Sequence, residues 1–239
     1  IALNALARIL SQREKFENAA LIYDYLNDVL DTNDEHSEKK VLEEPGSLTI
    51  KDGTGKAFEV SKGESCFIAG DDKHAVLAKI SGAKNCSFSL EIKCGNEVYS
   101  ELDGYPQVSR MESNAHIFNM SLMDNIALSE NVDSQKAKWC LRLALGDDLL
   151  EELPQGINTK LSKGLLSEED EKKVLLARCL YRERPLYIFE NLSSFLTAQE
   201  LLVFGYHLQV HLEGKTVLVS DNSSVLSKSC TKRVCLSED

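Results

Sequence analysis

The sequence LSKGLLSEEDEKKVLLARCLYRERPLYIFENLSS, from Leu161 to Ser194, decides the fold of this chain. A polar turn leads into a helical run that ends in LLARCL, and an Arg-Pro break separates this run from the apolar segment LYIF. Glu190 and Asn191 follow that segment directly. A charged helix start and a short apolar run between turn signals are typical of a helix followed by a buried strand. The stretch therefore predicts one helix–strand unit of an α/β fold.

Composition limits the classes of function. The chain has 239 residues, 43% of them hydrophobic, which is enough for one sizeable core or two joined lobes. Its 27 basic and 38 acidic residues give a formal net charge of -11, which argues against nucleic acid or an anionic membrane surface as a partner. No apolar run reaches about 18 residues, so no membrane-spanning helix is expected. Because the chain starts with Ile and lacks a signal peptide, we expect a fragment of a longer protein.

The cysteines are odd in number and have no Cys-x-x-Cys spacing. Several lie inside apolar runs such as SCFIAG and LLARCLY, which predicts free, buried thiols in a reducing cytosol. A weaker alternative is a metal site formed by Cys230, Cys235, His207 and His211, whose two histidines have helical spacing but no supporting pattern. The seven cysteines are Cys66, Cys86, Cys94, Cys140, Cys179, Cys230 and Cys235.

Strand patterns alternate with helical patterns along most of the chain. Short runs with strand character are expected at 48–50, 57–60, 65–68, 86–92, 97–99, 186–189, 216–219 and 233–236. Helical runs are expected at 74–80, at 121–153 with a break at Gly146, up to Tyr181, at 198–211 and again after the strand at 216–219. This order predicts an α/β fold with a partly parallel sheet and an inserted helical lobe.

Three further segments resemble one family in the order that the family requires. HIFNMSLMDNIAL (His116–Leu128) is similar to the exporter segment LFNGSIRENIAL, and ELPQG within 147–164 matches the segment that precedes the signature motif. GKTVLVSDNSSVL (Gly214–Leu226) resembles GKTVIVIAHRLSTL. Together with the stretch quoted first, these segments resemble the ATPase domain of ABC transporters of the exporter type. The resemblance implies a P-loop NTPase-like ABC ATPase fold with a partly parallel core sheet and a helical subdomain.

The same resemblance implies a division of the chain. Residues 1–30 have apolar side chains at a helical period and resemble the helix through which an exporter's membrane domain enters the ATPase domain. Residues 31–47 are charged and end in Pro-Gly, so a solvated linker is expected. Residues 48–239 form the ABC ATPase-like domain, with the helical subdomain at about 120–182.

The phosphate-binding loop of this family is altered. Such a loop reads Gly-x-x-x-x-Gly-Lys-Ser/Thr between a strand and a helix, whereas the segment after Gly70 is about three residues shorter and has Asp71 and Asp72 where phosphate oxygens would lie. Aligned on LAKISG, His74 rather than Lys73 takes the lysine position. The simpler interpretation is a strand–turn–helix with acidic N-terminal residues that the helix dipole favours. The degenerate positions are Gly70, Asp71, Asp72, Lys73, His74, Ala75 and Val76.

Other chemical positions of the family are altered as well. The magnesium-binding aspartate and the water-polarising glutamate become Glu190 and Asn191, and an amide cannot act as a general base. The Q-loop glutamine becomes Ser113, the switch histidine becomes Asn222, and the D-loop aspartate becomes Thr197. The signature motif LSGGQ is replaced by acidic residues, which are typical of a helix N-terminus. Its positions are Leu166, Ser167, Glu168, Glu169 and Asp170.

From this resemblance we expect a degenerate, catalytically inactive nucleotide-binding domain of an ABC exporter, a structural or coupling partner at the cytoplasmic face of the membrane. Its implied partners are a membrane-spanning exporter domain and a second ABC ATPase domain, in a homo- or heterodimer, and not nucleic acid. No cofactor is expected, and ATP and Mg bind only if residual family binding persists. Two alternatives remain: an atypical ATPase that holds nucleotide through Lys73 and Glu190, and a freestanding interaction or regulatory module.

Overall fold

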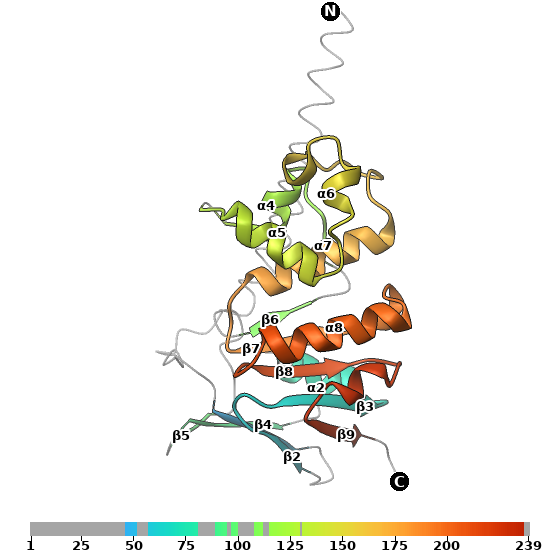
Figure 1. Ribbon diagram of the computed structural model, residues 1–239. Helices are drawn as coiled ribbons and strands as arrows, with labels where there is room; N and C mark the ends of the chain where they lie inside the picture. Colours follow the sequence, from blue (N-terminus) through green and yellow to red (C-terminus); the bar gives the residue numbers. More distant parts are fainter. Residues whose placement is uncertain are drawn as a thin grey trace, which may run out of the picture.

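The computed structural model describes residues 46–51, 57–80, 89–94, 97–99, 108–111, 115–129 and 131–236. The expected exporter-like helix at 1–30, nearly all of the expected linker at 31–47, and Ser113 lie outside these described residues. Figure 1 shows the arrangement of the described elements.

A five-stranded parallel sheet forms the centre of the fold (Figure 1). Every neighbouring pair in it is parallel, so the expected α/β class with a partly parallel sheet is confirmed. No strand is predicted from sequence at β6, because three residues are too few to show a period. In spatial order the strands are β6 (Val108–Arg110), β7 (Leu186–Glu190), β8 (Thr216–Ser220), β3 (Ser65–Gly70) and β9 (Lys232–Leu236).

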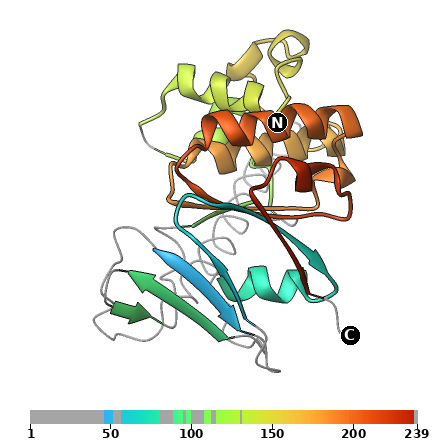
Figure 2. The ribbon, with the colours of Figure 1, turned by 60° about the horizontal axis from the view of Figure 1, so that its bottom comes forward.

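A second sheet has four antiparallel strands and packs on one side of the first, with which it shares a hydrophobic core (Figure 2). The linker was expected to extend to residue 47, but β1 already begins there, because Ser47 pairs with Lys93 of the neighbouring strand. In spatial order its strands are β2 (Ala57–Val60), β1 (Ser47–Lys51), β4 (Ser89–Cys94) and β5 (Glu97–Tyr99).

Alternate side chains of the central strands enter two separate hydrophobic cores. In β7, Leu186 and Ile188 pack into one core, and Tyr187 and Phe189 into the other. The strands β3 and β8 repeat this alternation. Because successive side chains of a strand point to opposite faces, a continuous apolar run such as LYIF fills both cores.

Helices cover both faces of the parallel sheet. Helix α2 lies with the antiparallel sheet on one side, and α7 and α8 lie on the other (Figure 2). No helix in the described part of the chain is long and apolar enough to cross a bilayer. The α-helices are α2 (Lys73–Ile80), α4 (Leu122–Ala127), α5 (Ser134–Leu143), α6 (Leu149–Glu152), α7 (Glu168–Tyr181) and α8 (Ala198–His211). The 3-10 helices are η1 (Gly156–Asn158), η2 (Leu192–Ser194) and η3 (Val225–Lys228).

The helical run expected at 121–153 is three helices rather than one run with a single break. The break at Gly146 is confirmed, but α4 also ends early, where Leu128 adopts a left-handed conformation with φ 43°. Asp133 then caps α5 by accepting two backbone N–H groups at 2.9 and 3.0 Å. Such a cap starts a new helix at low cost. The helix expected after β8 is only the 3-10 turn η3.

A buried arginine connects the helices of this lobe. Arg178 of α7 is only 6% exposed and donates from Nε to the backbone oxygen of Asn125 in α4 at 2.7 Å. Its Nη1 donates to the backbone oxygen of His116 at 3.0 Å, and its guanidinium lies 5.3 Å from the centre of the Phe118 ring. The Asn125 amide exchanges two 2.8 Å hydrogen bonds with the backbone of Phe118. This network joins the segments LLARCL and NIAL, both of which belong to the sequence resemblance.

We expect Asn125→Ala to lower the free energy of unfolding by about 1–3 kcal/mol. The change removes the side-chain acceptor of the buried Phe118 backbone N–H, whereas the Phe118 carbonyl keeps the backbone N–H of Met120 at 2.8 Å. Urea denaturation measures the loss. Asn131→Ala, at an exposed position between α4 and α5, is the control and should stay within about 0.5 kcal/mol. Equal losses in the two variants would contradict the role of the network.

The thiols of the described residues differ in burial. Cys66, Cys140 and Cys179 are free and buried, as expected, whereas Cys230 is half-buried and Cys235 is exposed. Burial raises the pKa of the Cys66 thiol to about 12 and that of the Cys140 thiol to about 11. Both thiols are therefore protonated at neutral pH.

We expect a thiol-alkylating reagent at pH 8 to modify Cys235 in the folded chain and to leave Cys66 and Cys140 unmodified. The thiolate is the reacting form, and burial both limits access and raises the pKa of the two buried thiols. Peptide mass spectrometry after timed alkylation locates the modification, and the same reaction in urea is the control that should label all three. Labelling of Cys66 at the rate of Cys235 would show that the interior described here opens readily.

Candidate functional site

Polar side chains from four elements meet at one end of the parallel sheet. Arg110 ends β6, Glu190 ends β7, Asn222 follows β8, and His74 lies in the first turn of α2, which follows β3. The carboxyl ends of parallel strands meet at one edge, where α/β proteins commonly bind ligands. A cavity of about 460 Å³ lies at this edge. Its lining includes the polar residues His74, Lys172, Glu190, Asn191, Ser193 and Asn222.

The Glu190 carboxylate is held from two sides. It is 8% exposed, and its Oε1 accepts from Nε and Nη2 of Arg110, each at 2.7 Å. Its Oε2 lies 3.1 Å from Nδ1 of His74, which donates to it. A carboxylate that accepts charge-assisted hydrogen bonds on both oxygens is compensated within the chain.

The connection between β3 and α2 consists of two residues, Asp71 and Asp72. Both are exposed, and neither lies inside the helix, because α2 begins at Lys73 and has no acidic residue in its first turn. Asp72 directly precedes the helix, and its backbone oxygen accepts from the N–H of Val76 at 3.1 Å, which agrees with the expected strand–turn–helix with acidic residues at its N-terminal end. Gly70 has φ 106°, and a Cβ there would lie 2.1 Å from the backbone oxygen of Leu236 in β9. Only glycine fits at this close approach.

Lys73 and Asn222 contact each other across the site. Lys73 Nζ donates to Asn222 Oδ1 at 2.5 Å. Asn191 adopts a left-handed conformation with φ 52° and ψ 37°, and its backbone N–H donates to the backbone oxygen of Ser220 at 2.9 Å. The left-handed region is accessible to Asn at low cost.

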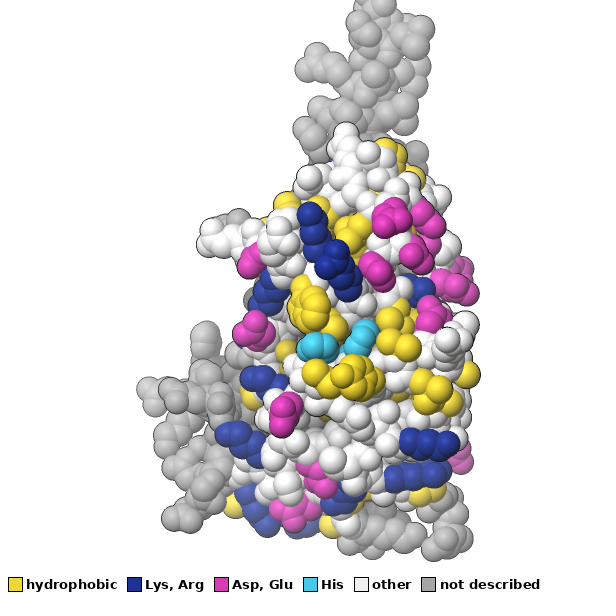
Figure 3. Space-filling model, viewed as in Figure 1, with side chains coloured by type: hydrophobic (Ala, Val, Ile, Leu, Met, Phe, Trp, Pro, Cys, Tyr) yellow, Lys and Arg dark blue, Asp and Glu magenta, His cyan; other side chains and the backbone are white. Residues whose placement is uncertain are grey.

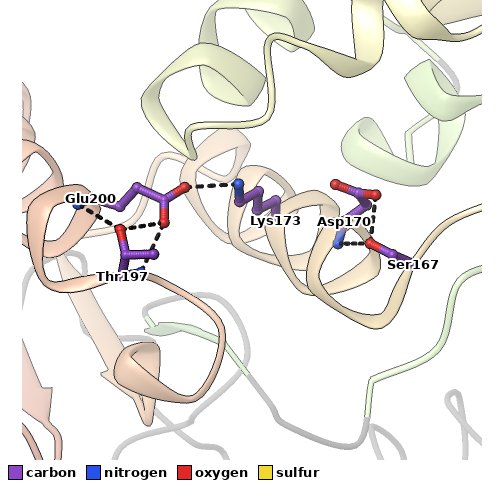
Figure 4. Close-up of polar contacts among 5 residues, drawn as sticks. All are labelled: Ser167, Asp170, Lys173, Thr197 and Glu200. Atoms are coloured by element: carbon purple, nitrogen blue, oxygen red, sulfur yellow. Dashed lines mark hydrogen bonds and ion pairs between the residues drawn. The ribbon is translucent and has the colours of Figure 1, made fainter.

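The signature-like residues form the N-terminal cap of α7 (Figure 4). Ser167 Oγ accepts from the backbone N–H of Asp170 at 3.1 Å and donates to its carboxylate at 2.6 Å. Thr197 caps α8 in the same way through a capping box with Glu200. Lys173 of α7 donates to Glu200 at 2.9 Å and joins the two helices. Two of the altered positions, Asp170 and Thr197, therefore have structural roles in this fold.

The other predicted positions are spread around the site. Glu168 and Glu169 are exposed in the first turn of α7, and Leu166 is buried before it. Ala75 and Val76 lie in α2, and Val76 packs into the core. The structure thus brings together Glu190 with His74, and Lys73 with Asn222, but not the acidic residues of α7.

Sequence reasoning missed two residues of this region. Arg110 ends the unpredicted strand β6, whose three residues, VSR, are too few to show a strand period. Asp221 is 3% exposed, and its carboxylate accepts from the backbone N–H groups of Ser193 and Ser223, both at 2.8 Å. It thereby connects the loop after β8 with the one after β7.

The alternative metal site has no support. The described residues contain no group of three or more His, Cys, Asp or Glu side chains that could hold a metal ion. Cys230, Cys235, His207 and His211 accordingly form no such group in the described part of the chain.

Comparisons with known proteins agree with the fold. No family model matches the chain. The chain is 27% identical over 115 residues to the ATP-dependent lipid A-core flippase of Paraburkholderia xenovorans. This match covers 47% of the chain and 19% of the relative. With the protein of the same name from Alkalilimnicola ehrlichii it shares 29% identity over 133 residues, 49% of this chain and 23% of the relative. The matches thus span about a fifth of the length of these relatives.

One solved structure, of a bacterial Atm1-family ABC exporter with ATP bound, aligns with a TM-score of 0.69. The alignment covers 88% of this chain and 42% of that chain at 17% identity, so it shows the fold. The parallel sheet, the helices on its faces and the partial sequence similarity to exporters agree with this fold. The chain therefore has the P-loop NTPase-like fold of this ABC exporter structure, and about half of it is similar in sequence to part of the flippases.

Proposed function

We propose that this chain is the degenerate, catalytically inactive nucleotide-binding domain of an ABC exporter and serves as a structural or coupling partner in transport. The observation that carries the proposal is the Glu190 carboxylate, whose oxygens are held by Arg110 and His74 at 2.7 and 3.1 Å. It takes the position where the family places its magnesium-binding carboxylate.

The ligands expected for a magnesium ion are not suitable in this chain. In P-loop ATPases a carboxylate at the end of this strand and a hydroxyl of the phosphate loop hold Mg²⁺. Here the Arg110 guanidinium already compensates Glu190, and a divalent cation at the same oxygens would face the repulsion of that positive charge. No Ser or Thr follows Lys73 in α2 to supply the hydroxyl. The residues present do not fit a magnesium ion.

The connection that would bind the phosphates is short and acidic. A phosphate-binding loop needs several consecutive backbone N–H groups that wrap around the anion before the helix begins. The two-residue connection of Asp71 and Asp72 is too short for such a loop and carries two carboxylates that repel phosphate. Lys73, which follows this connection, donates a hydrogen bond to Asn222. The residues present do not fit a triphosphate.

The residue expected to activate the attacking water is an amide. A general base must accept a proton from water, and the Asn191 amide cannot. The position expected for the switch histidine holds Asn222, which accepts from Lys73 instead. Loss of metal, phosphate and base positions together supports inactivity more strongly than the loss of any one of them.

The proposed setting follows from the relatives. The lipid A-core flippases and the Atm1-family structure are named as exporters or ATP-dependent transport proteins. We accordingly assign this domain to the cytoplasmic face of a membrane, with residues 1–30 leading to a membrane domain and residues 31–47 as the linker. A second ABC ATPase domain is its proposed dimer partner.

An atypical ATPase is the second candidate, because the cavity beside Glu190 contains Lys172 and His74 as possible anion ligands. Calorimetric titration with ATP separates the two candidates. We expect no saturable binding below about 1 mM, or about -4.1 kcal/mol, with or without Mg²⁺. Arg110→Ala, which releases Glu190, should leave this result unchanged because the phosphate loop is still missing. Micromolar affinity in the unmodified chain would overturn inactivity, and the family fold would stand.

We further expect that Asn191→Glu does not produce ATP hydrolysis. The change restores a general base, but the metal and phosphate positions remain unsuitable. Phosphate release measured over hours, with Asn191→Gln as the control of similar size, should be equal in the two variants. Release that only the Glu variant shows would mean that nucleotide binds despite the short connection after β3.

A further inference from the structure

The outer face of α8 carries an unusual row of exposed apolar side chains. Leu202, Val203, Tyr206 and Val210 are 56, 42, 62 and 46% exposed, and they lie on one stripe of the helix. Trp139 of α5 adds a fifth side chain, 47% exposed. We call these five residues the α8–α5 surface. Figure 3 shows apolar side chains grouped around two histidines on this face of the molecule. Clusters of this kind mark interaction sites more often than scattered apolar residues do.

Ring contacts hold the surface in one geometry. The edge of Trp139 packs against His211 at 5.1 Å between ring centres and at 88°. His211 lies 5.8 Å from His207, which lies 6.4 Å from Tyr206. His207 also donates to the backbone oxygen of Leu143 at the end of α5. The surface therefore spans two helices that are fixed to each other, which lowers the entropy lost on binding.

The part of the border that lies on α5 is basic. Lys138 and Arg142 are neighbours of Trp139 on α5, which contains no acidic residue, and Arg142 is exposed. The single acidic residue of α8, Glu200, is paired with Lys173. A basic border is distinctive in a chain with a net charge of -11. It favours a partner with carboxylates beside its own apolar stripe.

We propose that the α8–α5 surface docks an amphipathic helix of a partner protein that has an apolar stripe flanked by acidic residues. The apolar stripe lies along α8, and the acidic flank faces Lys138 and Arg142. A second copy of this chain is disfavoured, because a symmetric contact brings two basic borders together. An anionic bilayer is disfavoured by the net charge of -11. The surface lies on α8 and α5 and uses none of the residues at the carboxyl ends of the strands, so the proposal is independent of the nucleotide site.

Trp139 is the single tryptophan of the chain, so its fluorescence reports on the surface directly. The probe is a synthetic helical peptide with Leu on one stripe and Glu at its flanks, and the control peptide has Lys at every Glu position. We expect a saturable blue shift of Trp139 emission with the Glu peptide and an affinity at least tenfold weaker for the Lys peptide. The double variant Lys138→Glu and Arg142→Glu should reverse this preference.

Tyr206→Asp on α8 should weaken binding of the Glu peptide at least tenfold, and the matched control Val98→Asp, at an exposed apolar residue of β5, should not. Circular dichroism establishes that both variants are folded. The proposal is overturned if the Glu and Lys peptides bind equally or not at all. It is also overturned if vesicles of phosphatidylglycerol and phosphatidylcholine shift Trp139 emission while the Glu peptide does not. Sedimentation that shows self-association abolished by Tyr206→Asp would assign the surface to a second copy instead.

Discussion

The buried guanidinium of Arg178 is the interaction on which the helical lobe depends. It satisfies the backbone oxygens of Asn125 and His116 and lies against the Phe118 ring, so one side chain joins α7, α4 and the segment before α4. A charge at 6% exposure is stable only when its hydrogen bonds are made. Because α7 runs directly into β7, the same network also positions the strand that ends in Glu190.

The polar groups at the ends of the elements are satisfied within the chain. Arg110 and His74 complete the hydrogen bonds of the Glu190 carboxylate. Ser167 with Asp170 caps α7, and Thr197 with Glu200 caps α8. Glu190, Asp170 and Thr197 therefore each have a partner inside the described part of the chain, as buried and helix-capping polar groups require.

Local pattern was sufficient for the elements that pack. LYIF predicted a strand buried on both faces, and its side chains do alternate between the two cores. The helix at 198–211 was predicted with the bounds that the structure has, and the structure adds the Thr197 cap at its start. Pattern was insufficient for β6, which has three residues, and for the helical run at 121–153, which a left-handed Leu128 interrupts. A helix end that depends on the backbone angle of one residue cannot be predicted from the spacing of hydrophobic residues alone.

The sequence by itself determined the fold class and most of the order of the elements, because these follow from residue type and spacing, whereas the altered chemistry at Glu190, Asn191 and Asn222 stays a prediction. It could not determine what those positions do instead. Arg110 approaches Glu190 only because β6 and β7 pair in register, although the two residues are 80 positions apart in the sequence. Trp139 meets His211 for a similar reason, through the packing of α5 near α8. Contacts between residues far apart in sequence are set by tertiary packing, and only the structure shows them.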